Sequence, residues 1–206
     1  FRKQCGSPAG YNYVREGCNC SVVSEIAEAN DSLFILVPAH KRNDVQFLSS
    51  SALVKMLRKS RIPCFAVPEK SKYTEPESVD LALNYQSKQK TVTPWVVFFS
   101  KHLKTDINVY IPKTEDQRIT HNFIFFKKIC EKHNLNFNKI ENNKSVNQNR
   151  KFALKGNKKG IYFLNLNKQQ SLTELITGDK DARTIDSRSY PVFCINSRDD
   201  IYIPCT

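Results

Sequence analysis

Short, saturated runs of apolar residues are the feature that most limits how this chain can fold. Residues 33–37 (LFILV) are uniformly apolar and end at Pro38, and residues 64–67 (CFAV) end at Pro68. A run this short and without alternation is typical of a strand buried on both faces, as in a parallel sheet. The chain is therefore expected to build a parallel sheet whose two faces are both covered.

Amphipathic segments separate these runs, as helices must when they connect parallel strands. In residues 1–68 the order is β-α-β-α-β, with strands predicted at 11–16, 33–37 and 64–67 and helices at 21–30 and 52–60. Right-handed crossovers are expected for such an order.

A polar segment at residues 69–78 has no apolar period and is predicted to be a linker. The remaining residues, 79–206, predict a complete second unit. Its strands are expected at 79–85, 107–111, 135–140, 161–164 and 190–195, with an edge extension at 201–203, and its helices at 93–103, 120–133 and 146–154. Pro94 is expected in the first turn of its helix, where the missing N–H costs little.

An internal repeat connects the two units. The strand before Pro38 matches the strand before Asn165, and the later segment RIPCFAV matches SYPVFCI, with Pro63 and Pro191 at the same place. We therefore expect a tandem α/β fold of three layers, in which a parallel five-stranded sheet has helices on both faces. The first copy, residues 1–68, corresponds to the C-terminal part of such a domain, and residues 79–206 form the second.

Composition excludes several classes of protein. The 206 residues are 40% hydrophobic with no run long enough to span a bilayer, so neither disorder nor membrane insertion is expected. The formal charge of +12 favours anionic partners. Seven scattered cysteines, with no leader sequence before them, indicate a reducing compartment, and we expect a cytoplasmic protein. The chain starts at Phe1 without an initiator Met, which suggests that sequence is missing upstream.

The segment FILVPAHKRNDVQFLSSSALVKMLRKSRIPCFAVPE, within residues 34–69, resembles the closing strand-loop-helix-strand of universal stress protein domains. The resemblance implies a flavodoxin-like fold of the adenine nucleotide alpha hydrolase type. In that family a loop with spaced glycines, followed by Ser or Thr, wraps the phosphates of ATP. It also implies an Asp after the first strand, but the corresponding position of the second copy is Tyr85, with Ser87 two residues further on.

The glycine positions of this loop are mostly filled by other residues. The spacing falls on Pro38, Lys41, Ser51 and Ala52 in the first copy and on Asn165, Lys168, Gly178 and Asp179 in the second. A phosphate loop needs glycines so that several N–H groups can approach the oxygens, and proline has no N–H to offer. We therefore predict a degenerate cofactor-binding loop.

Two functions follow as hypotheses. The first is a non-enzymatic interaction or signalling module of the stress response, with no cofactor, no catalytic residues and an unidentified protein partner. The alternative is a weak ATP-binding protein, with slow or no hydrolysis, in which Lys41 and Lys168 replace backbone contacts to phosphate. The simpler alternative is that both lysines lie in solvent on a loop and bind no ligand.

Other candidate sites are weaker. The four histidines and the Cys18–Cys20 spacing do not have the pattern of a metal site, and no metal is expected. The basic residues 139–159 could contact nucleic-acid phosphates, but they lack interleaved aromatic residues, so a nucleic-acid partner is not expected. Cys64 and Cys194 are predicted to act as small buried hydrophobes.

The resemblance also implies pairing of final strands. In universal stress proteins the last strand of one domain often pairs with that of another, and tandem chains do this within one polypeptide. The matching pieces here contain Phe65, Val67, Phe193 and Ile195. We expect a pseudo-twofold arrangement of the two copies, with self-association through these strands.

Overall fold

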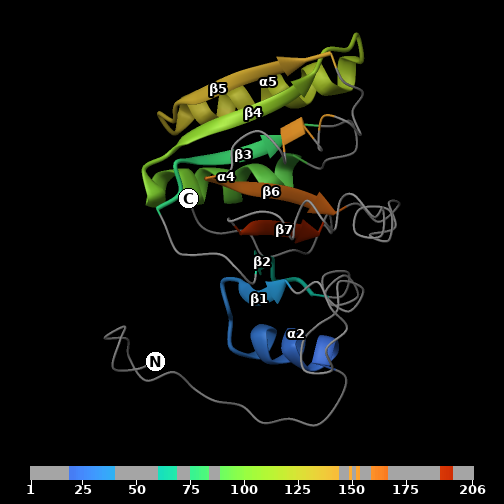
Figure 1. Ribbon diagram of the computed structural model, residues 1–206, viewed down its shortest axis with the longest axis vertical. Helices are drawn as coiled ribbons and strands as arrows, with labels where there is room; N and C mark the ends of the chain where they lie inside the picture. The colour runs from blue at the N-terminus through green and yellow to red at the C-terminus, as the bar shows by residue number, and fades with distance from the viewer. Residues whose placement is uncertain are drawn as a thin grey trace.

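A single seven-stranded sheet organises the protein in the computed structural model, which describes residues 19–39, 60–68, 75–83, 89–143, 149, 152–153, 159–166 and 191–196. The strand order is β1-β2-β7-β6-β3-β4-β5 (Figure 1). The strands are β1 (Ile35–Ala39), β2 (Cys64–Pro68), β3 (Ser78–Ala82), β4 (Asp106–Pro112), β5 (Phe137–Asn142), β6 (Gly160–Leu166) and β7 (Val192–Asn196).

Five of these strands form the parallel sheet predicted for residues 79–206. The neighbours β7–β6, β6–β3, β3–β4 and β4–β5 all pair in parallel. The other parallel pair is β1–β2, in which Leu36 faces Phe65 and Pro38 faces Val67. The expectation of parallel strands is confirmed, because the apolar runs at residues 33–37, 64–67 and 161–164 all lie within or overlap parallel-paired strands. Burial on both faces is wrong for the first run, since β1 lies at the edge of the sheet and Leu36 is 65% exposed.

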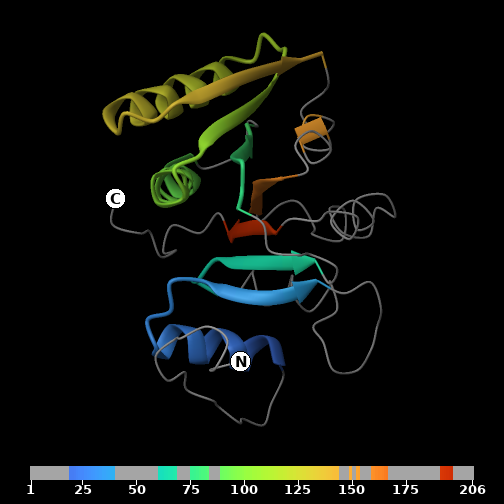
Figure 2. The same ribbon diagram turned by 60° about the vertical axis from the view of Figure 1, so that its left-hand side comes forward.

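One antiparallel pair joins the two parallel parts of the sheet. β2 and β7 pair with Cys64 opposite Cys194, Phe65 opposite Phe193 and Ala66 opposite Val192. This pairing has a local two-fold axis between Phe65 and Phe193. The axis relates the segment that follows Pro63 to the segment that follows Pro191, which are the two segments of the internal repeat. We call this β2–β7 pair the seam (Figure 2). The structure thus pairs the two final strands within one chain, and Val67 and Ile195 lie just beyond the paired residues.

Three helices are described. α2 (Asn19–Ala29) lies beside β1, whereas α4 (Gln89–Leu103) and α5 (Gln117–Lys132) pack together near β3, β4 and β5. α4 begins at Gln89, four residues before the predicted start, so Pro94 lies inside the helix and not in its first turn. Proline there removes only the N–H that would bond the carbonyl oxygen of Lys90, close to the N-terminal end.

Aromatic side chains from four elements, β2, α4, β6 and β7, form the centre of the core. Phe193 of β7 is fully buried, and its ring centroid lies 4.6 Å from Phe65, 5.1 Å from Trp95, 4.9 Å from Phe99 and 5.0 Å from Phe163. Such edge and tilted ring contacts add to the free energy gained by area burial. The cluster therefore connects β2, α4 and β6 around the seam.

Some predicted elements lie outside the described residues. They are the strands at 11–16 and 201–203, the helix at 52–60 apart from Ser60, and most of the helix at 146–154, of which Asn149, Phe152 and Ala153 are helical. The division of the chain into domains at residues 1–68, 69–78 and 79–206 stays a prediction. Among the helices that the structure describes, none combines the length and hydropathy needed to cross a bilayer.

Candidate functional site

The order of the strands locates the place where a ligand would bind. From β3 the chain proceeds through β4 to β5 on one side, then returns to place β6 and β7 on the other side of β3. In open parallel sheets, ligands bind outside the carboxyl ends of the strands where the strand order reverses. The candidate site is therefore the edge of the sheet at the carboxyl ends of β3 and β6.

Two amide side chains, one buried and one half-buried, occupy part of this edge. The Asn149 side-chain amide, which is fully buried, donates to the carbonyl oxygen of Leu83 at 3.3 Å and to that of Tyr110 at 2.9 Å. Asn142, the last residue of β5, donates to the Asn149 side-chain oxygen at 2.5 Å and to the Ile111 carbonyl oxygen at 3.4 Å. The carbonyl groups that end β3 and β4 are thus bonded to the chain itself. We call Asn142 and Asn149 the amide plug.

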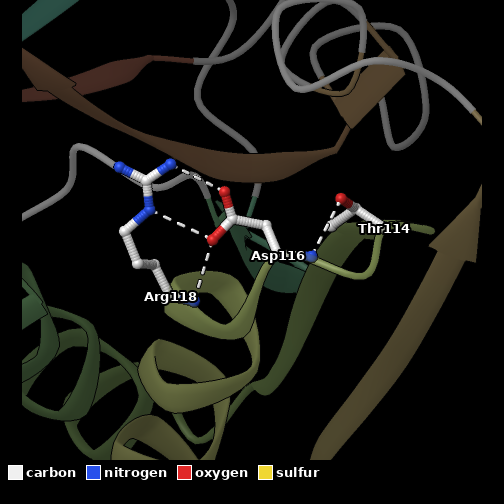
Figure 3. A network of polar contacts seen from close by, with 3 residues as sticks. All are labelled: Thr114, Asp116 and Arg118. Carbon is white, nitrogen blue, oxygen red and sulfur yellow. Dashed lines mark hydrogen bonds and ion pairs between the residues drawn. The ribbon is translucent and has the colours of Figure 1, made fainter.

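The N-terminus of α5 lies at the same edge, because α5 follows β4 after a short loop. Its N-cap is Asp116, whose carboxylate accepts hydrogen bonds from the Arg118 backbone N–H at 2.9 Å, the Arg118 Nε at 3.1 Å and the Arg118 Nη2 at 2.8 Å (Figure 3). The Asp116 N–H donates to the Thr114 hydroxyl at 3.2 Å. The hydrogen bonds from the Arg118 side chain and backbone lower the pKa of Asp116.

A helix N-terminus often binds an anion, because its free N–H groups and the helix dipole both favour negative charge. Here the carboxylate of Asp116 already provides that charge. Arg118 neutralises it with a second set of hydrogen bonds. The α5 terminus is therefore occupied by the protein's own ion pair.

The structure places two of the eight predicted loop positions at equivalent points. Pro38 is the fourth residue of β1 and faces Val67, and Asn165 lies in β6 and faces Ile195. Pro38 lies two residues after Leu36, which faces Phe65, and Asn165 lies two residues after Phe163, which faces Phe193. The equivalence expected from the spacing is thus observed at the strand ends. The other six positions, Lys41, Ser51, Ala52, Lys168, Gly178 and Asp179, together with Tyr85 and Ser87, lie outside the described residues.

A second polar group lies inside the sheet and was not predicted as a site. Asp80, in the middle of β3, is fully buried, and its Oδ1 accepts from the Ser78 hydroxyl at 3.0 Å and from the Asn108 amide at 2.8 Å. Asn138 of β5 donates in turn to the Asn108 side-chain oxygen at 3.2 Å. We call these four residues the polar ladder. The available signal was a charged residue within the otherwise apolar segment 79–83.

Neither Cys130 nor Cys194 resembles a nucleophile. Burial raises the pKa of Cys130 to about 12, with a further contribution from Glu131, and burial alone raises that of Cys194 to about 12. A nucleophilic cysteine needs a lowered pKa, since the thiolate is the reactive form. In the part of the chain that the structure describes, no group of three or more His, Cys, Asp or Glu residues could hold a metal ion.

Similarity to known proteins is found in the fold. No protein-family model and no curated protein sequence matches the chain. Among solved structures, a universal stress protein from Archaeoglobus fulgidus matches with a TM-score of 0.59 at 14% identity, over 88% of this chain and 66% of that one. A protein of unknown function from Pseudomonas aeruginosa PAO1 matches with a TM-score of 0.53 at 11% identity, over 90% of this chain and 70% of that one.

A candidate universal stress protein from Pseudomonas aeruginosa UCBPP-PA14 matches with a TM-score of 0.54 at 11% identity, again over 90% of this chain and 70% of that one. The present chain thus spans about two thirds of the length of the Archaeoglobus structure. These likenesses define the class: an α/β protein with the universal stress protein fold. At such low identity, the likeness concerns the fold and carries no ligand or activity with it.

Proposed function

We propose that this protein is a stress-response protein of the universal stress type that acts by binding another protein, has no catalytic activity and does not use ATP. The observation that carries the proposal is the amide plug, because Asn149 holds the carbonyl groups at the ends of β3 and β4. Those ends lie beside the crevice in which a nucleotide would have to bind in this fold.

The composition of the loop positions supports the same proposal. Pro38 has no N–H and a fixed φ, and Asn165 carries a side chain where the resemblance implies glycine. A cradle for phosphate depends on backbone N–H groups that point together at the oxygens. The N-terminus of α5 at that part of the edge is already occupied by the Asp116–Arg118 ion pair.

A protein-binding role in the cytoplasm completes the proposal. Cys64, Cys130 and Cys194 are free thiols, as is usual for a protein of a reducing compartment. The partner is a protein that has not been identified, and self-association between chains through the final strands stays a prediction.

The test is nucleotide binding to the full chain. Differential scanning fluorimetry and calorimetric titration with Mg-ATP up to millimolar concentration should show no saturable effect, and phosphate release should equal the protein-free rate. A ligand at a hundredfold its Kd would stabilise the folded state by about 2.7 kcal/mol, which is readily detected.

A saturable rise in Tm with ATP would contradict the proposal and favour the weak nucleotide-binding hypothesis. In that case Lys41→Ala and Lys168→Ala should each weaken the effect, because those two lysines are the candidate phosphate ligands. Lys90→Ala is the matched control, since Lys90 is an exposed lysine in the first turn of α4.

A further inference from the structure

Two buried thiols face one another across the seam. Cys64 of β2 is opposite Cys194 of β7 in the antiparallel register, and their exposed fractions are 0% and 4%. Both are free thiols. They are far apart in the sequence, and they belong to the two parallel parts of the sheet that the seam joins.

The register brings their side chains to the same face of the sheet. Opposed residues of an antiparallel pair have Cα atoms about 4.5–5.5 Å apart, and a disulfide spans Cα separations of about 4.4–6.8 Å. Burial raises the pKa of the Cys64 thiol, and the neighbouring Cys194 raises it further, as expected of two sulfurs at close range. The Cys194 thiol itself lies 3.9 Å from the Val192 carbonyl oxygen.

We propose that Cys64 and Cys194 are a disulfide-forming site, oxidised by peroxide, that covalently joins the two parallel parts of the sheet. This site is separate from the crevice at the carboxyl ends of β3 and β6. The inference does not depend on the proposed function.

The reaction balances with hydrogen peroxide as the oxidant. One sulfur, as thiolate, attacks a peroxide oxygen, the O–O bond breaks, and a sulfenic acid and water form. The second sulfur then attacks the sulfenic sulfur, the S–S bond forms, and a second water leaves. Two thiols are oxidised by two electrons in all, and one peroxide is reduced to two waters.

Burial determines when this reaction can occur. The thiolate is the reactive species, and the surroundings of both sulfurs favour the neutral thiol. The native seam therefore protects the pair, and local opening of β2 from β7 exposes it to the oxidant. Oxidation should be slow in buffer and faster in urea below the unfolding transition.

The experiment is peptide mapping of the full chain after hydrogen peroxide treatment in low urea, without reductant. Trypsin should release the peptide of residues 62–70 linked to that of residues 189–198, each of which contains one cysteine. Reduction should separate them. The oxidised protein should unfold with a Tm at least roughly 5 °C higher, because the new bond closes a long loop of the unfolded chain.

The seam supplies its own control substitutions. The local two-fold axis makes Val192 of β7 the equivalent of Cys64 of β2, and Ala66 of β2 the equivalent of Cys194 of β7. Cys64→Val and Cys194→Ala should therefore fold, and each should abolish both the linked peptide and the Tm rise. Cys130→Ala should retain both, since Cys130 lies on α5.

Three results would overturn the inference. One is that both thiols stay reduced in low urea while the fully unfolded chain is oxidised. Another is that either sulfur forms a disulfide with a different cysteine or is oxidised to sulfinic acid. The third is a linked peptide that leaves the Tm unchanged.

Discussion

Gly160, the first residue of β6, allows the Asp80 carboxylate to lie inside the sheet. A Cβ at this position would be 2.2 Å from the Asp80 Oδ2 and 2.5 Å from the Ser78 hydroxyl oxygen. Both atoms belong to residues of the polar ladder, in which the Ser78 hydroxyl and the Asn108 amide donate to the other carboxylate oxygen, Oδ1. The absence of a side chain at Gly160 is therefore a packing requirement of the buried carboxylate.

Gly160→Ala should destabilise the protein by about 1–3 kcal/mol, because the ladder must shift to make room for the methyl group. Urea unfolding, followed by tryptophan fluorescence, measures the loss. The double variant Gly160→Ala/Asp80→Ala should lose less than the sum of the two single variants, since removal of the carboxylate also removes the clash. Simple additivity would show that the clash is relieved elsewhere.

His133, which caps the C-terminus of α5, should make the stability depend on pH. Its Nδ1 lies 2.9 Å from the Lys101 Nζ, and partial burial followed by the charges of Lys101 and Lys132 lowers its pKa. A group with a lowered pKa in the folded state binds protons more readily when unfolded. Its contribution is complete above the unfolded pKa, near 6.5, and decreases as the pH falls below that value.

Wild-type protein should therefore show a small fall in Tm between pH 7.5 and pH 5.5 that His133→Gln reduces. Glutamine can still accept a hydrogen bond from Lys101 but does not titrate. An identical pH dependence in both proteins would assign the fall to other groups. The measurement is the Tm by differential scanning fluorimetry at constant ionic strength.

At the level of the element, α5 begins at a single N-cap residue, Asp116. The helix has no acidic residue in its first turn, and the N-cap Asp116, preceded by Glu115, supplies negative charge at its N-terminus. The half-buried Asp116 carboxylate has a lowered pKa because Arg118 donates to it from its side chain and its backbone. The cap thus joins β4 to α5 at the candidate edge.

Asp116→Ala should lower the Tm by a few degrees at neutral pH, because the Arg118 N–H loses its acceptor. The difference from wild type should shrink in acid, as the pH falls through the lowered pKa and the wild-type carboxylate gains a proton. Asp116→Asn keeps an acceptor oxygen and should lose less. A difference that stays constant into acid would mean that the ion pair contributes nothing.

At the level of the whole molecule, the seam decides how the two parallel parts are joined. β2 has a strand on each side, and so does β7, so neither final strand has an open edge in the described sheet. Pairing between these strands therefore takes place within the chain and removes two edges that could otherwise aggregate. The aromatic cluster at the seam places side chains from β2, β6, β7 and α4 in one core.

Phe193→Ala should cost about 3–5 kcal/mol, because it empties a fully buried position in contact with at least four other aromatic rings. Chemical unfolding gives the value. Ile124→Ala is the matched control: Ile124, on α5, is 46% exposed and should lose less than about 1 kcal/mol. Equal losses for the two variants would indicate that the seam is not part of the cooperative core.

The strands were more predictable than the site. The runs at residues 33–37, 64–67 and 161–164 could be predicted as strands directly, because each is an uninterrupted apolar run. Burial on both faces could not be predicted for the first run, because only the strand order places β1 at the sheet edge with Leu36 65% exposed. The polar ladder could not be predicted as a network, since Asp80, Asn108 and Asn138 meet only after three strands align in register. The amide plug was equally hidden: nothing local marks Asn149 as the partner of Leu83 and Tyr110.

By itself, the sequence determined the alternation of helix and strand, the parallel direction of pairing and the equivalence of Pro38 and Asn165. Each of these depends on local apolar pattern or on the short connections of the chain. Only the tertiary structure decided that the two parallel parts form one sheet and which residues face each other across the seam. It also decided which amide side chains donate to the carbonyl groups at the edge of the sheet. Those contacts join residues distant in sequence, so their register is set by packing and not by local preference.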